Sequence, residues 1–222
     1  MKKPVKLTLY LLACTALVFL LWIRGDCPRL SAQAALRRIE SINLQPKSDF
    51  VTAVNLGQVR SNSGNYQRYL AAGVTDTHLH MAQIRSRVWF WYCDHDFYRP
   101  LVSLPLEDGP VAGIAPDDWP FDHTFFLYTP QPAESWAATV TVGDLSYTTE
   151  GACDPSGFTL FEFPQLEDCS EAVSNNLKAH AYDMLNIGYA KDSKNADITL
   201  TATLFGADGQ PVGFASRDYP AS

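Results

Sequence analysis

The sequence lacks the short motifs that mark the common catalytic and nucleotide-binding sites. It contains no Gly-x-Ser-x-Gly motif, phosphate-binding loop, dinucleotide fingerprint or Cys-x-x-Cys pair. Residues 192–197 also lack the glycine and the distal glutamate of a calcium-binding loop. Without a coherent catalytic set, an enzyme hypothesis has to be built from isolated residues.

Basic residues and glycosylation sites are also scarce. The chain has 17 basic and 24 acidic residues, and without the three lysines at positions 2, 3 and 6 the balance is 14 against 24, a formal charge of −10. An acidic domain of this kind is repelled by phosphate backbones, which argues against DNA or RNA binding. No Asn-x-Ser/Thr sequon occurs beyond the N-terminal region, which favours a bacterial periplasm over a eukaryotic secretory route.

Residues 7–23 form a long hydrophobic run without a charged side chain. As a helix this run extends for about 26 Å, close to the thickness of a bilayer's hydrocarbon core. Because the lysines precede it, the positive-inside rule places residues 1–6 in the cytoplasm and the rest of the chain outside. We therefore expect a transmembrane signal-anchor at residues 7–23, a membrane-proximal helical segment at 24–47 and an extracytoplasmic α+β domain at 48–222.

Three alternatives to an uncleaved anchor follow from the same residues. Ala32-Gln33-Ala34 has the form of a signal-peptidase site but lies well beyond the hydrophobic run. Leu11-Leu12-Ala13-Cys14 suggests a lipoprotein signal, yet the chain stays apolar after Cys14. A pilin-like leader normally has a glycine before its cleavage point and a glutamate soon after, and neither is found here. The uncleaved anchor is the favoured interpretation.

Four of the five cysteines follow the hydrophobic run, where thiols of an exported chain tend to be oxidised. Four cysteines allow three pairings. Proximity in sequence favours a disulfide between Cys153 and Cys169, which leaves Cys27 to pair with Cys93. The remaining cysteine, Cys14, lies inside the hydrophobic run.

Hydrophobic periodicity predicts more strands than helices. Helices are expected at residues 31–42, at residues 66–72, and after a capping box formed by Asp168 and Glu171. This last helix would bury Val173, Leu177, His180, Ala181 and Met184 on one face. Strands are expected at residues 49–59, 84–93, 123–128, 136–142, 145–149, 158–163, 197–205 and 210–217. Because short turns such as Gly143-Asp144 join the strands, the pattern indicates an α+β fold with one antiparallel sheet. Residues 100–120, with five prolines, are expected to form a surface loop.

Asp76-Thr77-His78-Leu79-His80 places two histidines two residues apart, so that on an extended chain both imidazoles face one metal ion. The string resembles the His-x-His signature of the amidohydrolase-like metal hydrolases, which bear it at the end of their first barrel strand. That resemblance implies a barrel, but only 142 residues follow His80, fewer than the roughly 200 that a barrel needs. The alternative to a metal site is that these residues form an exposed polar segment that leads into the aromatic strand.

A second cluster, Cys93-Asp94-His95-Asp96, could join His78 and His80 in holding zinc or another divalent metal. Cys93 could alternatively act as a nucleophile with a histidine base. A disulfide at Cys93 would abolish its nucleophilic and thiolate-ligand roles, so the favoured interpretation is a polar turn after a disulfide-bonded strand end.

The aromatic run at residues 89–92, with Phe97 and Tyr98, could form a stacking platform for a sugar or peptide. Successive residues of a strand face opposite ways, and large aromatic side chains dominate sheet interiors, so burial in the core is favoured. His180 falls in the apolar stripe of its helix and is expected to be a hydrogen-bonded core residue.

The leading hypothesis is a non-enzymatic, membrane-anchored module outside the cytoplasm that binds a protein or cell-wall partner. Examples are a periplasmic inhibitor, an immunity-type protein or a subunit of an envelope assembly. It requires no cofactor. The alternative is a small metal-dependent hydrolase built on His78 and His80 together with His95 or Asp96.

Overall fold

The computed structural model describes residues 3–24, 29–61, 64–87, 89–93, 101–106, 109–116, 123–184 and 195–221. Within these residues the chain is an α+β protein with three antiparallel sheets and three α-helices. The α+β class and the antiparallel pairing expected from the sequence are confirmed. The strands form three sheets, however, where one was expected.

The helices and strands have the following bounds. The helices are α1 (Lys3–Arg24), α2 (Ala32–Ile42) and α3 (Glu171–Met184), with a 3-10 helix, η1, at Pro164–Leu166. Sheet A contains β1 (Asp49–Ser61), β2 (Gly64–Val74), β3 (His78–Arg87), β4 (Phe90–Cys93) and β5 (Val102–Pro105). Sheet B contains β6 (Val111–Ile114), β7 (Thr124–Tyr128) and β10 (Phe158–Glu162). Sheet C contains β8 (Ser135–Val142), β9 (Leu145–Ala152), β11 (Ile198–Phe205) and β12 (Pro211–Tyr219).

The strand orders determine which edges are open. In sheet A the order is β1-β2-β3-β4, and β5 also pairs with β3. In sheet B the order is β10-β7-β6, and in sheet C it is β12-β11-β8-β9. The expected two-residue hairpin at Gly143-Asp144 is confirmed, because Val142 pairs with Leu145 and Gly143 takes a positive φ of 59°.

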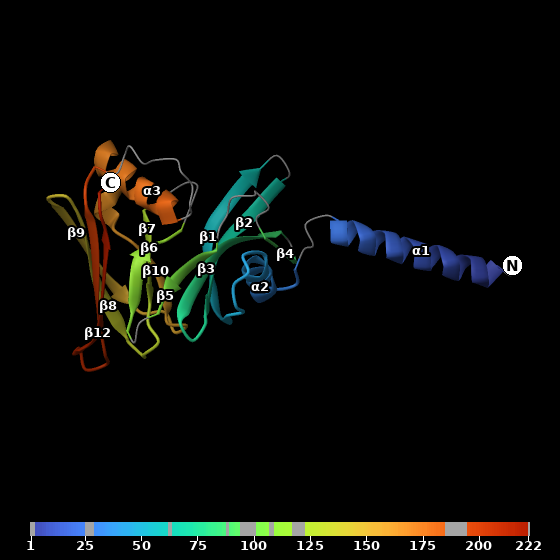
Figure 1. The fold of residues 1–222 in the computed structure, drawn as a ribbon, viewed down its shortest axis with the longest axis horizontal. Coiled ribbons are helices and arrows are strands. Elements are labelled where there is room, and N and C mark those ends of the chain that lie inside the picture. The colour runs from blue at the N-terminus through green and yellow to red at the C-terminus, as the bar shows by residue number, and fades with distance from the viewer. Residues whose placement is uncertain are drawn as a thin grey trace.

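The domain is built in layers, with α2, sheet A, sheet B and sheet C following one another (Figure 1). The middle strand of sheet B, β7, is buried at all five residues because alternate side chains face opposite layers. Phe126 and Tyr128 pack in the core between sheets A and B. Phe125 and Leu127 pack in the core between sheets B and C, where α3 contributes Val173, Leu177 and Ala181.

The helix α2 covers the outer face of sheet A. Its buried residues Ala32, Ala35, Leu36 and Ile39 pack against side chains of β2, β3 and β4. Ser31 caps the helix by accepting a hydrogen bond from the backbone N–H of Ala34. The expected helix at residues 31–42 is therefore confirmed, and part of the expected membrane-proximal segment contributes to the domain core.

The helix α1 projects away from the layered domain (Figure 1). Its side chains from residue 5 to residue 19 are exposed, and the three core clusters of the described residues contain none of them. Residues 7–23 are helical as expected. In the part of the chain that the structure describes, no helix has both the length and the apolar character needed to cross a membrane, so the expected span is not confirmed.

Three expectations about secondary structure are wrong. Residues 66–72 belong to strand β2, because both of its neighbours, β1 and β3, pair with it and override the local helix propensity. The expected strand at residues 84–93 is the end of β3 and all of β4, separated by a turn at Trp89. The loop expected at residues 100–120 contains strands β5 and β6.

The helix after Asp168 is present as α3, but its N-terminus differs from the expected capping box. The hydroxyl of Ser170 accepts a hydrogen bond from the backbone N–H of Val173 at 3.4 Å, and the Ser170 carbonyl accepts from Ser174. Val173, Leu177, His180 and Ala181 are buried as expected. The side chain of Met184 lies outside the described residues.

Candidate functional site

The most distinctive polar arrangement in the described domain centres on His80. This histidine lies in β3 on the face that α2 covers, and its exposed fraction is 0%. Its Nδ1 atom lies 3.0 Å from Oε1 of Glu40, a residue of α2 that is also 0% exposed. The expectation that this stretch is an exposed polar segment is therefore wrong for His80, because α2 closes over β3.

Ser48 completes the arrangement from the segment that leads into β1. Its backbone N–H donates to Glu40 Oε1 at 3.1 Å, and its hydroxyl donates to the same oxygen. Ser48 is 2% exposed. One carboxylate oxygen thus accepts from β3 and from the entry to β1, so Glu40 connects α2 to two places on sheet A.

Gly73 makes the close approach of Ser48 possible. It pairs with His80 across β2 and β3, and a Cβ added there would overlap the Ser48 side chain and lie 3.0 Å from Leu36 Cδ2. Gly73 directly follows the helix that the sequence predicts at residues 66–72, whereas in the structure it lies within β2 and leaves room for Ser48 beside Glu40.

In this conformation the Glu40–His80–Ser48 cluster has a structural role and not a catalytic one. The serine hydroxyl bonds to the carboxylate and not to the imidazole, so the order differs from that of a serine nucleophile activated by a histidine base. Oε2 of Glu40 and Nε2 of His80 are buried and have no hydrogen-bond partner among the described residues. With all three residues buried, the cluster holds α2 on sheet A and does not present a group to a substrate.

The proposed metal ligands are brought together only in part. The His78 and His80 rings lie on the same face of β3, with their centroids 6.5 Å apart. Nδ1 of His78 lies 2.8 Å from the hydroxyl of Thr77. One of the two ring nitrogens of His78 is therefore already hydrogen-bonded. His95 and Asp96 fall outside the described residues, and no group of three candidate ligands is found among those that are described. The hydrolase hypothesis therefore stays a prediction without an assembled ligand set.

The cysteines are thiols in the described structure. Cys93 is buried, and its Sγ donates to the carbonyl of Ala35 at 3.5 Å. Cys153 and Cys169 are half-buried against the same core cluster but are not bonded to one another, so the expected disulfide between them is absent. Burial raises the pKa of both thiols. Cys27, the expected partner of Cys93, lies outside the described residues.

The aromatic run divides between core and surface. Trp91 is half-buried, with its ring centroid 4.7 Å from that of Tyr69, and Tyr92 packs edge-on to Tyr66. Trp89 is 80% exposed at the turn between β3 and β4. Core burial is therefore wrong for Trp89 and only partly met by Trp91, which packs half-buried against the core under α2, while Phe97 and Tyr98 lie outside the described residues. His180 is 3% exposed beside Tyr219, as expected of a core histidine.

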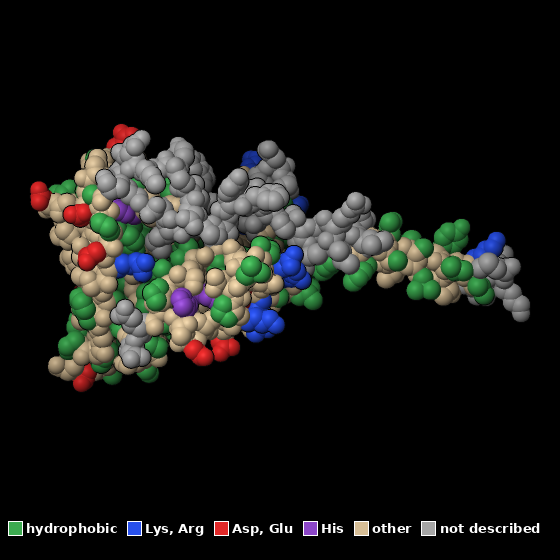
Figure 2. Space-filling model, in the orientation of Figure 1, with side chains coloured by type: hydrophobic (Ala, Val, Ile, Leu, Met, Phe, Trp, Pro, Cys, Tyr) green, Lys and Arg blue, Asp and Glu red, His purple; other side chains and the backbone are tan. Residues whose placement is uncertain are grey.

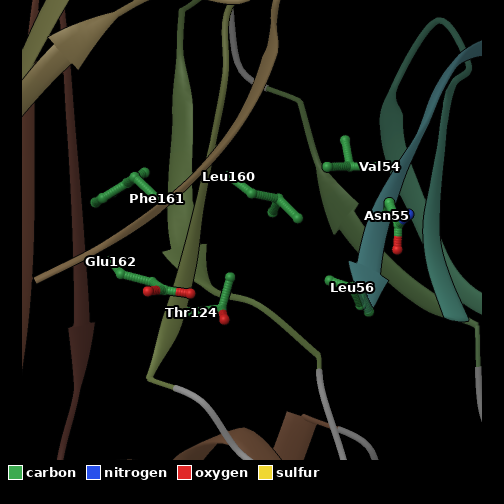
Figure 3. Close-up of a pocket in the computed structure, with 7 residues that line it drawn as sticks. All are labelled: Val54, Asn55, Leu56, Thr124, Leu160, Phe161 and Glu162. Carbon is green, nitrogen blue, oxygen red and sulfur yellow. The ribbon is translucent and has the colours of Figure 1, made fainter. Parts of the chain in front are cut away.

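Of the hollows in the described surface that are large enough for a small ligand or a peptide side chain, two join residues of different sheets. One, of about 490 Å³, lies where the entry to β1 meets the end of β2, and its charged lining residues are Lys47, Asp49 and Asp76. Tyr128 also lines it, and burial raises the pKa of the Tyr128 hydroxyl. The other, of about 350 Å³, lies between β1 and β10 (Figure 3). Sequence reasoning identified neither hollow, because each joins residues from separate sheets or distant turns.

Glu40 was also missed, although the sequence carries a signal for it. The buried positions of α2 are 32, 35, 36, 39 and 40, which follow the three- and four-residue spacing of a helix face. Glu40 therefore falls on the apolar stripe, and a carboxylate at such a position requires a buried partner.

Comparisons with known proteins supply no relative for this arrangement: no family model, curated protein or solved structure matches the chain.

Proposed function

We propose that the chain is a membrane-attached binding module outside the cytoplasm, with α1 attaching the layered domain to a membrane. The domain would engage a protein or cell-wall partner, in the manner of an inhibitor, an immunity-type protein or a subunit of an envelope assembly. The observation that carries the proposal is the apolar, exposed surface of α1, which lies outside the three core clusters.

The composition of α1 supports an apolar environment around it. Large side chains such as Leu9, Leu12 and Phe19 are each more than half exposed. Burying an apolar side chain of this size contributes roughly 1.5–3 kcal/mol. A helix with many such side chains is therefore stabilised by a lipid or protein environment and not by water.

The charge distribution agrees with attachment at the α1 end. On the face shown in Figure 2, most Lys and Arg side chains lie on the half of the domain nearer α1. Most Asp and Glu side chains lie at the sheet C end and along the lower edge of the view. Arg37 and Arg38 of α2 are exposed on the near side. Basic residues close to a bilayer are attracted to anionic headgroups, and the acidic far side is repelled from them.

Membrane fractionation tests the attachment. We expect the full chain to remain in the membrane fraction after high-salt washing and to be lost from it when Leu12 and Leu17 are both replaced by Asp. A matched change on the domain surface, Leu44→Asp, should leave the protein in the membrane fraction, since Leu44 is 92% exposed and lies beyond α2.

Carbonate washing and mass spectrometry complete the test. Retention after carbonate treatment indicates an integrated helix, and release indicates an interfacial one. A soluble full chain, or a mature N-terminus at Ala35, would contradict attachment through α1. Protection of the domain from protease added outside the cytoplasmic membrane would contradict its proposed location.

A further inference from the structure

The charges of the layered domain are divided along the chain. Residues 29–93, which supply α2 and strands β1 to β4, carry eight basic and three acidic side chains, a formal charge of +5. Residues 94–222, which supply sheets B and C, carry five basic and 20 acidic side chains, a formal charge of −15. A negatively charged surface attracts the basic part of such a molecule and repels the acidic part, so it orients the molecule.

Two contacts fix where α1 meets the domain, and both involve β4. The ring of Trp22, near the end of α1, packs edge-on to Phe90 with the centroids 5.6 Å apart. Arg29 exchanges backbone hydrogen bonds with Trp91. The helix α2 packs on the same strand, and Figure 1 shows it as the outermost layer of the domain on the α1 side. A membrane that holds α1 would therefore lie close to the exposed face of α2.

The exposed face of α2 and the turn after it carry positive charge. Arg37 and Arg38 are exposed on the helix, and Lys47 is exposed in the segment that follows. The one acid in residues 29–47, Glu40, is buried against sheet A. Every exposed charge in this stretch is therefore positive, in a chain that is acidic overall.

Large apolar side chains accompany these cations. Leu30, Ile42 and Leu44 are 77%, 55% and 92% exposed, and none of them belongs to a core cluster of the described residues. Leu44 also takes a φ of 56°, the left-handed conformation that glycine or asparagine ordinarily adopts just after a helix. Packing within the domain does not stabilise a leucine at this position, whereas the interface of a bilayer accepts apolar and basic side chains together.

We propose that the exposed face of α2 and the turn after it form a docking surface for the anionic phospholipid headgroups of the membrane that holds α1. Arg37, Arg38 and Lys47 contact the phosphates, and Ile42 and Leu44 enter the apolar edge of the headgroup layer. This rests on the proposed attachment through α1 and deepens it by naming a second contact and its lipid class. The helix α1 holds the chain in the membrane, and the α2 surface determines which side of the domain lies against the lipid.

Photo-crosslinking to lipid tests the docking in the full chain. Leu44→p-benzoylphenylalanine places a photoreactive side chain on this surface, and the chain is inserted into nanodiscs of phosphatidylcholine and phosphatidylglycerol. We expect irradiation to give a lipid adduct that intact-mass spectrometry detects. The matched control, Thr148→p-benzoylphenylalanine, lies at an exposed position of β9 in sheet C and should give none. A yield at position 44 no higher than at position 148 would overturn the proposal.

Lipid composition and charge identify the headgroup. The yield at position 44 should be at least about fivefold lower in nanodiscs of phosphatidylcholine alone. It should also fall at about 1 M salt, where screening limits charge attraction to roughly 3 Å. A yield that depends on neither would overturn anionic headgroups as the partner.

A double substitution locates the charges that bind. Arg37→Ala with Arg38→Ala should lower the yield at position 44 at least about fivefold. The control, Thr148→Glu with Ala152→Glu, changes the net charge by the same amount at exposed positions of β9 and should leave the yield unchanged. Equal losses for the two pairs would show only a general response to net charge and would overturn the assignment to α2.

Nanodisc assembly separates this proposal from the attachment through α1. A chain that does not co-purify with nanodiscs contradicts the attachment, whereas an inserted chain without an adduct contradicts only the docking. For a chain that does not insert, the same label is irradiated after mixing with phosphatidylglycerol vesicles. An adduct there supports the α2 surface, and its absence overturns it.

Discussion

The packing of α2 against sheet A depends strongly on Glu40. Its Oε1 atom accepts hydrogen bonds from the backbone and side chain of Ser48 and contacts Nδ1 of His80. A buried carboxylate is costly to desolvate, so its contribution lies in the groups that it satisfies. Removing it would leave those groups buried without a partner, which costs more than the pair itself contributes.

Substituting Glu40 tests this dependence. We expect Glu40→Ala to lower the free energy of unfolding by about 3–5 kcal/mol, because it leaves one side of a buried pair uncompensated. The measurement is chemical denaturation followed by circular dichroism. Arg37→Ala, at an exposed position of the same helix, should change the value by about 0.5 kcal/mol or less. A loss for Glu40→Ala no larger than that of the control would contradict the role assigned to the carboxylate.

Cys153 and Cys169 should react slowly with alkylating reagents. Burial raises the pKa of Cys153 and Cys169, so at pH 8 each holds a smaller fraction of the reactive thiolate than an unperturbed cysteine does. We expect their alkylation by iodoacetamide to be slower than that of glutathione. The midpoint of its pH dependence should lie above the ordinary thiol value.

Mass spectrometry of the native, unreduced protein provides the check. Under denaturing conditions Cys153 and Cys169 should each take up one alkyl group without added reductant. A peptide that joins Cys153 to Cys169 and is lighter by two hydrogens would show that the pair is oxidised in the cell, contrary to the free thiols of the structure.

At the level of elements, local pattern predicted the strands that lie between short turns. The strands near residues 136–142 and 145–149 and the C-terminal hairpin are all present. Their alternating side chains and tight turns make pairing local, so the sequence alone specifies them. In β2 the run Leu70-Ala71-Ala72 is buried on both faces, so no alternation is visible and helix formers indicated a helix.

The helix α3 provides the test at the level of elements. Leu177 is 0% exposed in the core between sheets B and C. Leu177→Ala should lower the free energy of unfolding by about 2–5 kcal/mol through lost burial and a residual cavity. Asn175→Ala, at an exposed position of the same helix, should be close to neutral, within about 0.5 kcal/mol. An unchanged denaturation midpoint for Leu177→Ala would show that a different face of α3 packs on the sheets.

At the scale of the whole molecule, the arrangement of layers was beyond what the sequence could predict. A completely buried strand such as β7 lacks alternation, so nothing local reveals that it has a sheet on either side. The Glu40–His80 contact joins residues 40 positions apart, and the hollow of about 350 Å³ lies between β1 of sheet A and β10 of sheet B. Contacts of this range depend on how sheets stack, and that follows from side-chain packing over the whole chain.

One short segment, residues 25–28, limits the distance between the end of α1 and the layered domain. Arg29 exchanges two backbone hydrogen bonds with Trp91, of 2.6 and 2.8 Å, which fasten it to β4. Between Arg24, the end of α1, and Arg29 there are only four residues, whose fully extended length limits the separation to about 17 Å. With α1 in a membrane, sheet A and the exposed Trp89 therefore stay near the lipid surface while sheet C points outward. If α1 is held in a membrane as proposed, a partner of this domain would have to come to the membrane, because the segment between Arg24 and Arg29 is too short to extend the domain toward a distant one.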